Sequence, residues 1–428
     1  MERRRFFKLV AGSTLLPLFS SMRLWGAPSS FNGDFFIQVQ VDAGWDTSSF
    51  CDPKENLSGE KKINYWADSS TTQEIGNLRY APFGENAKFF TSHYKKILIV
   101  NSVNAYTNSH TVGRLYNFTG RTSKGYPSLS ASYAAVNGKD FPLPVIYNGG
   151  EFFTSGLVVG TKLGNDTATF KDILIPEERN AKGAFFSSEN TELINGFIQR
   201  RAAEFDKQNV AMPKQRASIA EYQKAIIPAE SALGFESILD AIDHGNFDST
   251  NKFNRQLLYA LTSFKSGLSI SADVVVGGFD THDNHDERHE PKLAQLTTGL
   301  DYMWYLAEQL GIAERLVVLV ASDFARTPYY NAKQGKDHWS VGSNLFMAYN
   351  PSWGNRMVGK TNEGQQAYAI NPSTLQVDTQ QGIVMEPKHM LHAGRKLLGI
   401  ANDPLMTPFD LRTDGIEFDI FNPSLITV

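Results

Sequence analysis

The stretch LVVLVASD at residues 316–323 is the clearest signal for both fold and site in this sequence. Its first five residues are apolar and three of them are β-branched, which is typical of a strand buried on both faces. An aspartate follows directly, at the point where such a strand would end. In an open α/β sheet, ligands bind at the carboxyl ends of the parallel strands. The stretch therefore predicts a buried parallel strand that carries a functional side chain at its end.

Four other apolar runs share this composition, namely residues 35–41, 97–100, 145–147 and 274–276. Helical patterns lie among them, and the longest cover residues 191–205, 215–243, 253–267, 291–311 and 388–400. Strands that alternate with helices predict a three-layer α/β/α sandwich with a mainly parallel sheet. We expect one globular domain over residues 28–428, in which the helix-rich residues 165–265 form an insertion or cap.

The amino terminus resembles an export signal. Residues 1–8 read MERRRFFK, an apolar run follows to residue 19, and small residues lead to Ala27. This run is too short, and too broken by Gly12 and Pro17, to serve as a stable transmembrane anchor of about 20 residues. The basic segment resembles the twin-arginine consensus, with Glu2 in place of the usual Ser or Thr, although an ordinary secretory signal remains the alternative.

The expected destination follows from this signal. We expect residues 1–27 to be removed and the folded chain to reach the periplasm or the medium through the twin-arginine translocase. Cys51 is the only cysteine, so an internal disulfide is excluded and stability must come from packing. The net charge is −4, and because residues 1–27 hold five basic groups and one acidic group, the remainder is near −8. This charge disfavours a nucleic-acid partner.

Polar residues follow three of the predicted strands. Asp42 follows the first, Asp280 and His282 follow the run at 274–276, and Asp323 follows the run at 316–320. Because these strand ends would share one edge of the sheet, the carboxylates would converge and repel one another. A divalent metal would turn them into ligands, and His338 offers a further imidazole. The alternative for any one aspartate is a turn residue or a helix cap.

Three motifs carry a family resemblance: GFDTH at 278–282, SDFARTP at 322–328 and GKDHW at 335–339. Together with the leader they resemble the DUF1501 proteins, a group of exported bacterial proteins related to the alkaline phosphatase and sulfatase superfamily. The resemblance covers nearly the whole chain. It implies an α/β/α sandwich with one or two divalent metals, commonly zinc, calcium or manganese, and cleavage of phosphate or sulfate esters.

The chain departs from the superfamily pattern in two places. One residue separates Asp280 from His282 where the phosphatases have three, and Phe324 follows Asp323 where they have histidine. One metal is therefore the safer expectation, with Asp42, Asp280, His282, Asp323 and His338 as its candidate ligands.

The resemblance also implies a hydroxyl nucleophile at the start of a helix after an early strand. Thr107 or Ser109 would supply it and His110 would be a further ligand or a base, while the alternative is that Ser109 only caps the helix. Arg326 would hold the substrate anion through its fork of donors, or bind a carboxylate structurally.

The remaining histidines favour structural interpretations. His389 and His392 are expected to pack on a carboxyl-terminal helix, and the polar run at residues 283–290 is expected to be a solvated loop and helix start.

These observations favour an exported, metal-dependent hydrolase that acts on a small anionic ester or a surface polymer. The second hypothesis is a non-catalytic envelope protein of the same fold, with a structural metal or none. The third is a module that binds a surface polysaccharide through Trp339, Tyr329 and Tyr330.

Overall fold

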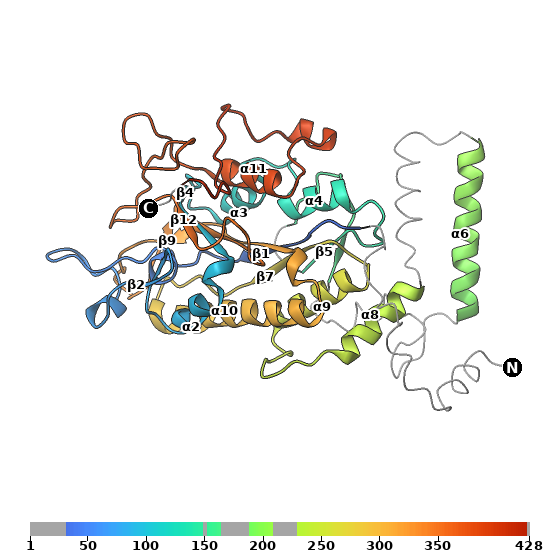
Figure 1. The fold of residues 1–428 in the computed structure, drawn as a ribbon, viewed down its shortest axis with the longest axis horizontal. Coiled ribbons are helices and arrows are strands. Elements are labelled where there is room, and N and C mark those ends of the chain that lie inside the picture. Colours follow the sequence, from blue (N-terminus) through green and yellow to red (C-terminus); the bar gives the residue numbers. More distant parts are fainter. Residues whose placement is uncertain (1–30, 149–151, 164–187, 209–228, 426–428) are drawn as a thin grey trace.

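The computed structural model describes residues 31–148, 152–163, 188–208 and 229–425 (Figure 1). Its centre is an eight-stranded sheet of order β12-β4-β11-β8-β1-β7-β5-β6. The strands are β1 (Phe35–Val41), β4 (Ile97–Asn104), β5 (Val145–Tyr147), β6 (Gly160–Lys162), β7 (Ser271–Val276), β8 (Leu316–Ser322), β11 (Val341–Ala348) and β12 (Arg356–Val358). Strand β11 pairs antiparallel with β4 and β8, whereas every other pairing is parallel. The expected mainly parallel sheet is confirmed.

Helices cover both faces of this sheet. On one face lie α3 (His110–Thr119), α4 (Leu129–Asn137) and α11 (Pro387–Leu397), and on the other lie α2 (Asn86–His93), α9 (Lys252–Lys265) and α10 (His285–Gln309), as Figure 1 shows. All seven residues of β1 are buried, which explains why its sequence is a nearly continuous apolar run. The expected three-layer α/β/α sandwich is therefore confirmed.

Strand β11 is a central strand that the sequence analysis did not find. In its sequence VGSNLFMA, Gly342, Ser343 and Asn344 follow the first valine and interrupt the apolar pattern. The strand returns the chain across the sheet from a two-residue ribbon in which β9 (Ala325–Arg326) pairs with β10 (His338–Trp339). This ribbon brings His338 opposite Arg326 at the carboxyl edge of the sheet.

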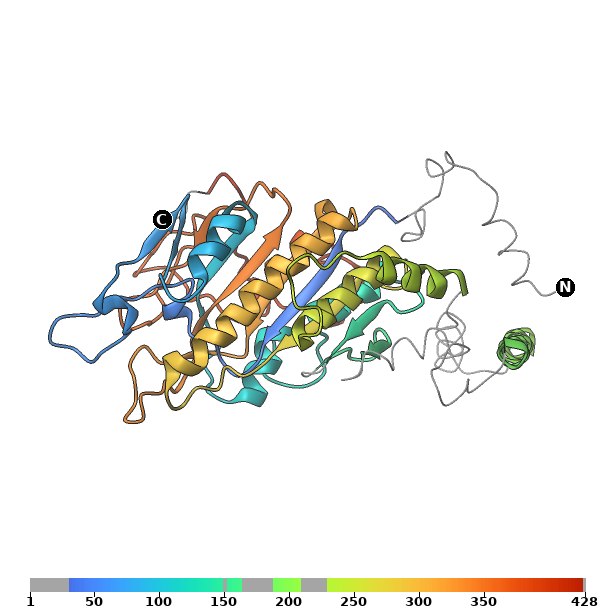
Figure 2. The same ribbon diagram turned by 90° about the horizontal axis from the view of Figure 1, so that it is seen from below.

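The helix-rich region divides into parts with different surroundings. Helix α9 packs on β7 and is part of the sandwich, and α8 (Ala229–Ala241) packs on α9. Helix α6 (Ser188–Gln208) stands apart from the sheet, at the end of the molecule where the chain enters β1 (Figures 1 and 2). It thus lies away from the carboxyl ends of the strands. The first part of the helix expected at 215–243 lies outside the described residues.

Helix α10 begins at His285, six residues before the expected start, and Pro291 lies inside it. No helix within the described residues combines the length and the apolar composition that a bilayer crossing requires.

Candidate metal centre

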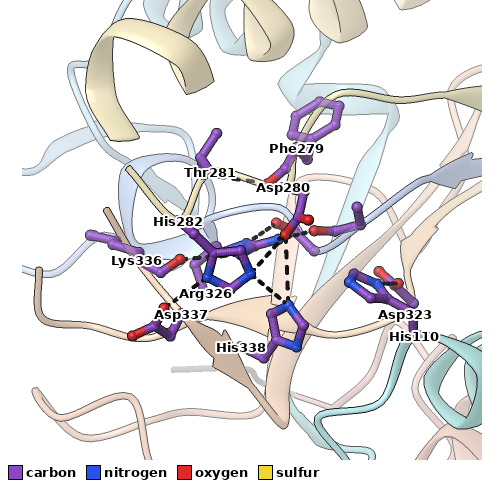
Figure 3. A network of polar contacts seen from close by, with 12 residues as sticks. His110, Phe279, Asp280, Thr281, His282, Asp323, Arg326, Lys336, Asp337 and His338 are labelled. Atoms are coloured by element: carbon purple, nitrogen blue, oxygen red, sulfur yellow. Dashed lines mark hydrogen bonds and ion pairs between the residues drawn. The ribbon is translucent and has the colours of Figure 1, made fainter. Parts of the chain in front are cut away.

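The site lies where β4, β7 and β8 of the sheet end, beside the β9–β10 ribbon, and Figure 3 shows its side chains. His110 is the first residue of α3, which follows β4. Asp280 and His282 lie in the loop after β7, and Asp323 follows β8 directly. His338 comes from the β9–β10 ribbon. The convergence expected from parallel strands therefore brings together residues that are as much as 228 positions apart in the chain.

Two histidines flank the carboxylate of Asp280. The Nε2 atom of His282 lies 3.0 Å from Asp280 Oδ1, and that of His338 lies 3.6 Å from it. His110, Asp280 and His338 each offer a ligand atom, and these atoms lie within 4.8 Å of one another. This group is compact enough to hold one metal ion.

Each of the three histidines is oriented through its other nitrogen. Nδ1–H of His110 donates to Asp323 Oδ2 at 2.6 Å and that of His282 to Asp337 Oδ1 at 2.7 Å. Nδ1–H of His338 donates to the backbone oxygen of Asn108 at 2.8 Å. A carboxylate or carbonyl partner at one ring nitrogen is the usual support of a metal-binding histidine, because it leaves the opposite nitrogen as a lone-pair donor.

The close approach of the His282 and His338 rings indicates that a cation fits between them and Asp280. Nε2 of His282 and Nε2 of His338 lie 3.0 Å apart. With both Nδ1 atoms protonated, the two Nε2 lone pairs face each other and repel unless a positive charge lies near both. Figure 3 shows both rings turned toward Asp280. The compact group offers two imidazole nitrogens and one carboxylate oxygen, and His282 adds a third imidazole beside Asp280. Nitrogen and carboxylate donors of this kind suit zinc.

The charges around Asp280 keep it ionised and keep His338 neutral. Burial alone would raise the pKa of Asp280, but the hydrogen bond and the charge of Arg326 lower it below its usual value. Burial lowers the pKa of His338, as do the nearby positive charges of Arg326, His110 and His282. Both shifts favour the protonation states that bind a metal.

Arg326 is fully buried behind this carboxylate. Its Nε donates to Gly44 O at 2.8 Å, its Nη1 to Lys336 O at 3.1 Å, and its Nη2 to Asp280 Oδ1 at 2.8 Å and also to Ala43 O. These bonds occupy most of the guanidinium and explain the position of Asp280. The arrangement favours the structural alternative for Arg326 over a direct contact with substrate.

Asp42 and Asp323 lie outside the compact group of possible ligands. Arg114 Nη2 donates to Asp42 Oδ1 at 2.6 Å, and its Nε lies 3.9 Å from Asp323 Oδ2. Asp323 is nearly fully buried, and it supports His110 from behind. The structure thus places Asp323 in a supporting position and Asp42 in an ion pair. Sequence reasoning missed Arg114, although its spacing of four from His110 puts both on one face of α3.

The two candidate nucleophiles lie just before α3. Ser109 is at the N-cap position, but its side chain makes no capping hydrogen bond and is exposed. The hydroxyl oxygen of Thr107 accepts from the backbone N–H of Ser109 at 3.2 Å. Both hydroxyls therefore lie near the positive end of the helix dipole, one and three residues before His110.

A buried ionic network lies beneath the site. Asp46 Oδ2 accepts from Lys336 Nζ at 2.7 Å and from His285 Nε2 at 3.0 Å, and all three side chains are inaccessible. His285 and His289 are one turn apart at the start of α10 and face this network, so the expectation of a solvated loop at 283–290 is wrong for both. All residues from 283 to 290 are polar or charged, so the sequence carries no apolar signal of a buried helix start there.

A second group of possible ligands consists of Glu386, His389 and Asp414. Lys388 Nζ lies 3.1 Å from Glu386 Oε1 and 2.8 Å from Asp414 Oδ2, so a side-chain cation already neutralises the carboxylates. The Nδ1 of His389 accepts from the backbone of Glu386, and its Nε2–H donates to Asp414 at 2.9 Å. This group is a complete salt-bridge network, in line with the structural role expected for His389.

Comparisons with known proteins agree with the sequence motifs. The model of a family described as "Protein of unknown function (DUF1501)" matches residues 192–396, a range that contains all three motifs. The resemblance stated above is confirmed over that range. No curated protein matches the chain by sequence.

Several solved structures are remotely similar to this chain. One comes from work on the metabolism of multiple glycosaminoglycans by Bacteroides thetaiotaomicron, with 8% identity, a TM-score of 0.40, and coverage of 86% of this chain and 73% of that one. Another is the lipoteichoic acid synthase LtaP of Listeria monocytogenes, with 12% identity, a TM-score of 0.37 and coverage of 91% and 76%. A third is the alkaline phosphatase of the Antarctic bacterium TAB5, with 10% identity, a TM-score of 0.30 and coverage of 76% and 94%.

Proposed function

We propose that this chain, whose residues 192–396 match the DUF1501 family model, is an exported hydrolase that cleaves phosphate or sulfate esters at a single divalent metal. One observation carries the proposal. The Nε2 atoms of His282 and His338 lie 3.0 and 3.6 Å from Asp280 Oδ1, and a ligand atom of His110 lies within 4.8 Å of Asp280 and His338. The Nδ1 atoms of the three histidines are held by Asp323, Asp337 and the Asn108 carbonyl.

The proposed metal ligands are His110, Asp280, His282 and His338. A zinc ion bound there would polarise an ester oxygen and lower the pKa of a water molecule. Calcium and manganese fit less well, because three of the four donors are imidazoles and calcium prefers oxygen ligands. Arg326 would hold the Asp280 carboxylate in position, as its hydrogen bonds do in the structure.

The substrate anion would lie at the amino terminus of α3. The free backbone N–H groups there favour anions, and Arg114 on the next turn adds a guanidinium that is partly exposed. Thr107 and Ser109 remain the candidate nucleophiles, and a water molecule is the alternative.

Metal content is the direct test. We expect the mature protein, purified without chelator, to hold close to one zinc per chain, and the double variant Asp280→Ala/His282→Ala to hold none and to lose ester cleavage. Asp414→Asn, in the salt-bridge network of α11, is the matched control and should keep both the metal and ester cleavage.

A second variant tests the support of His282. Asp337 is half-exposed, so Asp337→Ala should fold normally and weaken metal binding by about 10- to 100-fold through the loss of support for His282.

Full ester cleavage in the double variant, or a folded wild type without metal, would contradict the proposal.

The variants Thr107→Ala and Ser109→Ala decide which hydroxyl, if either, is the nucleophile. Loss of turnover with normal metal content in one of them identifies that hydroxyl, and normal turnover in both leaves water as the nucleophile.

The second candidate is a non-catalytic envelope protein with a structural metal. This candidate is supported by the ion pair between Asp42 and Arg114, because Asp42, one of the expected metal ligands, is bound to an arginine side chain instead. This function predicts normal metal content without cleavage of any phosphate or sulfate ester across the pH range. Export through the twin-arginine translocase to the periplasm or the medium is part of both proposals.

A further inference from the structure

A groove of about 700 Å³ lies beside the β9–β10 ribbon. It is lined by three aromatic residues, Tyr329, Trp339 and Tyr368, and by polar side chains of two neighbouring loops. Trp339 is directly next to His338 in β10, and successive side chains of a strand point to opposite faces. The groove therefore lies on the far side of the ribbon from the candidate metal centre.

The aromatic rings of the groove are held in place by hydrogen bonds. The indole N–H of Trp339 donates to the backbone oxygen of Gln365 at 2.7 Å. The hydroxyl of Tyr329 donates to Glu60 Oε2 at 3.1 Å. The polar atoms of both rings are thus hydrogen-bonded within the protein, and their carbon faces are left for a ligand. Because these side chains are already held in place, they lose little conformational entropy when a ligand binds.

The loop that forms one wall is anchored in the protein interior. The side chain of Gln365 is fully buried and donates to Thr47 Oγ1 at 2.7 Å, although its backbone has a positive φ of 55°. Thr361 is also buried and donates to Asp52 Oδ2 at 2.6 Å. These contacts fix the wall before any ligand binds, so the groove is a built feature.

The polar groups of the wall have free hydrogen-bonding capacity. Within the described part of the chain, Lys360 and Glu363 have no side-chain hydrogen bond or ion pair, and the same is true of the Nε2 group of Gln366. The groove thus combines apolar ring faces with a charged donor, a charged acceptor and an amide. A pyranose ring has the matching chemistry, because its C–H faces are apolar and its hydroxyls project from the edge.

We infer that this groove binds a saccharide chain, with sugar rings against Trp339 and Tyr329 and sugar hydroxyls toward Lys360 and Glu363. A proline-rich peptide also packs on aromatic rings, but it has few hydrogen-bond donors for the polar wall. The inference does not rest on the proposed hydrolysis. If both hold, the groove would retain a surface polysaccharide while one of its ester groups reaches the metal centre around the two-residue ribbon.

A glycan array with neutral, N-acetylated, sulfated and phosphorylated oligosaccharides tests the inference. We expect the mature protein to bind at least one class of oligosaccharide, and Trp339→Ala to lower the affinity for it at least tenfold. Tyr349 is an exposed tyrosine outside the groove lining, so Tyr349→Ala is the matched control and should bind normally. Circular dichroism and metal content of Trp339→Ala should match the wild type.

The results also separate this inference from the proposed function. Binding that survives complete chelation of metal and the Asp280→Ala/His282→Ala substitutions supports the groove whether or not the protein is a hydrolase. Absence of binding to every oligosaccharide on the array, or equal binding by Trp339→Ala, overturns the inference. Binding of a proline-rich peptide with equal loss in Trp339→Ala, and no binding of sugars, would assign the groove to peptides.

Discussion

At the scale of single residues, Asp273 is a carboxyl group inside the sandwich that the proposed chemistry does not use. It lies in β7 and accepts from Gln38 Nε2 at 2.9 Å, Gln40 Nε2 at 2.5 Å and Ser130 Oγ at 3.1 Å. Burial outweighs these hydrogen bonds and raises the pKa of Asp273 to about 8. The folded protein therefore keeps this proton at neutral pH while the unfolded chain loses it near its usual pKa of about 4.

This shift predicts a pH-dependent effect of Asp273→Asn. Between about pH 4 and pH 8 the folded state binds the extra proton, so Asp273 lowers the free energy of unfolding by up to about 1.4 kcal/mol for each unit of rising pH. The amide has no such cost, and it can donate to Gln38 Oε1, which is buried without a partner. Urea unfolding at pH 5 and pH 8 should show a stability gain for the variant that is larger at pH 8. An equal difference at the two pH values would contradict the assignment.

The candidate ligands were partly predictable at this scale. Asp280, His282 and His338 belong to motifs at strand ends, and their types alone suggest a metal. Asp337 and Arg114 were not found, because supporting residues are defined by the atoms they contact in space rather than by spacing. The neighbours of Asp42 and Asp323 were unpredictable for the same reason, since both contacts come from α3.

At the scale of elements, the position of α3 depends on Gly113. A Cβ atom at this residue would lie 2.3 Å from the backbone oxygen of Asp323, so any larger residue pushes the helix away from the end of β8. His110 and Arg114 would move with the helix. We expect Gly113→Ala to lower the free energy of unfolding by about 1–3 kcal/mol, the usual cost of overpacking, and to weaken metal binding at least tenfold.

Thermal unfolding and metal titration measure these two effects. Gly277→Ala is the control, because a Cβ atom there would meet Asp42 only at an ordinary contact distance of 3.9 Å, and it should alter neither quantity much. Unchanged metal affinity in Gly113→Ala would show that α3 does not set the geometry of the site.

Elements differed in how well the sequence predicted them. Strand β1 was predicted with its exact bounds, because five of its seven residues are apolar, as is typical of a strand that is buried on both faces of a parallel sheet. Strand β11 is equally central but starts with small and polar residues, and its antiparallel direction cannot be read from local sequence. Helix α10 starts earlier than its apolar period indicates, because His285 and His289 form its buried face there.

At the scale of the whole molecule, the twin-arginine signal stays a prediction from sequence, because residues 1–30 lie outside the described part of the structure. We predict that Arg3→Lys/Arg4→Lys abolishes export, because the twin-arginine pair is the feature that its receptor reads. Immunoblots of cytoplasmic and periplasmic fractions measure this. The control variant Arg5→Lys makes the same arginine-to-lysine change outside the pair, and this protein should be exported normally. Normal export of the double variant would favour an ordinary secretory signal.

The spread of the candidate ligands along the chain has a consequence for how this protein matures. His110 and His338 lie 228 residues apart in the chain, and β11, the strand that joins the ribbon to the sheet, pairs with a strand more than 230 residues earlier. Such non-local pairing is slow, because the loop between the partners must close first. A nascent chain that ends before residue 338 therefore lacks one of the proposed ligands. The complete centre would form, and metal would be acquired, only after that residue has been synthesised and β11 has paired with β4.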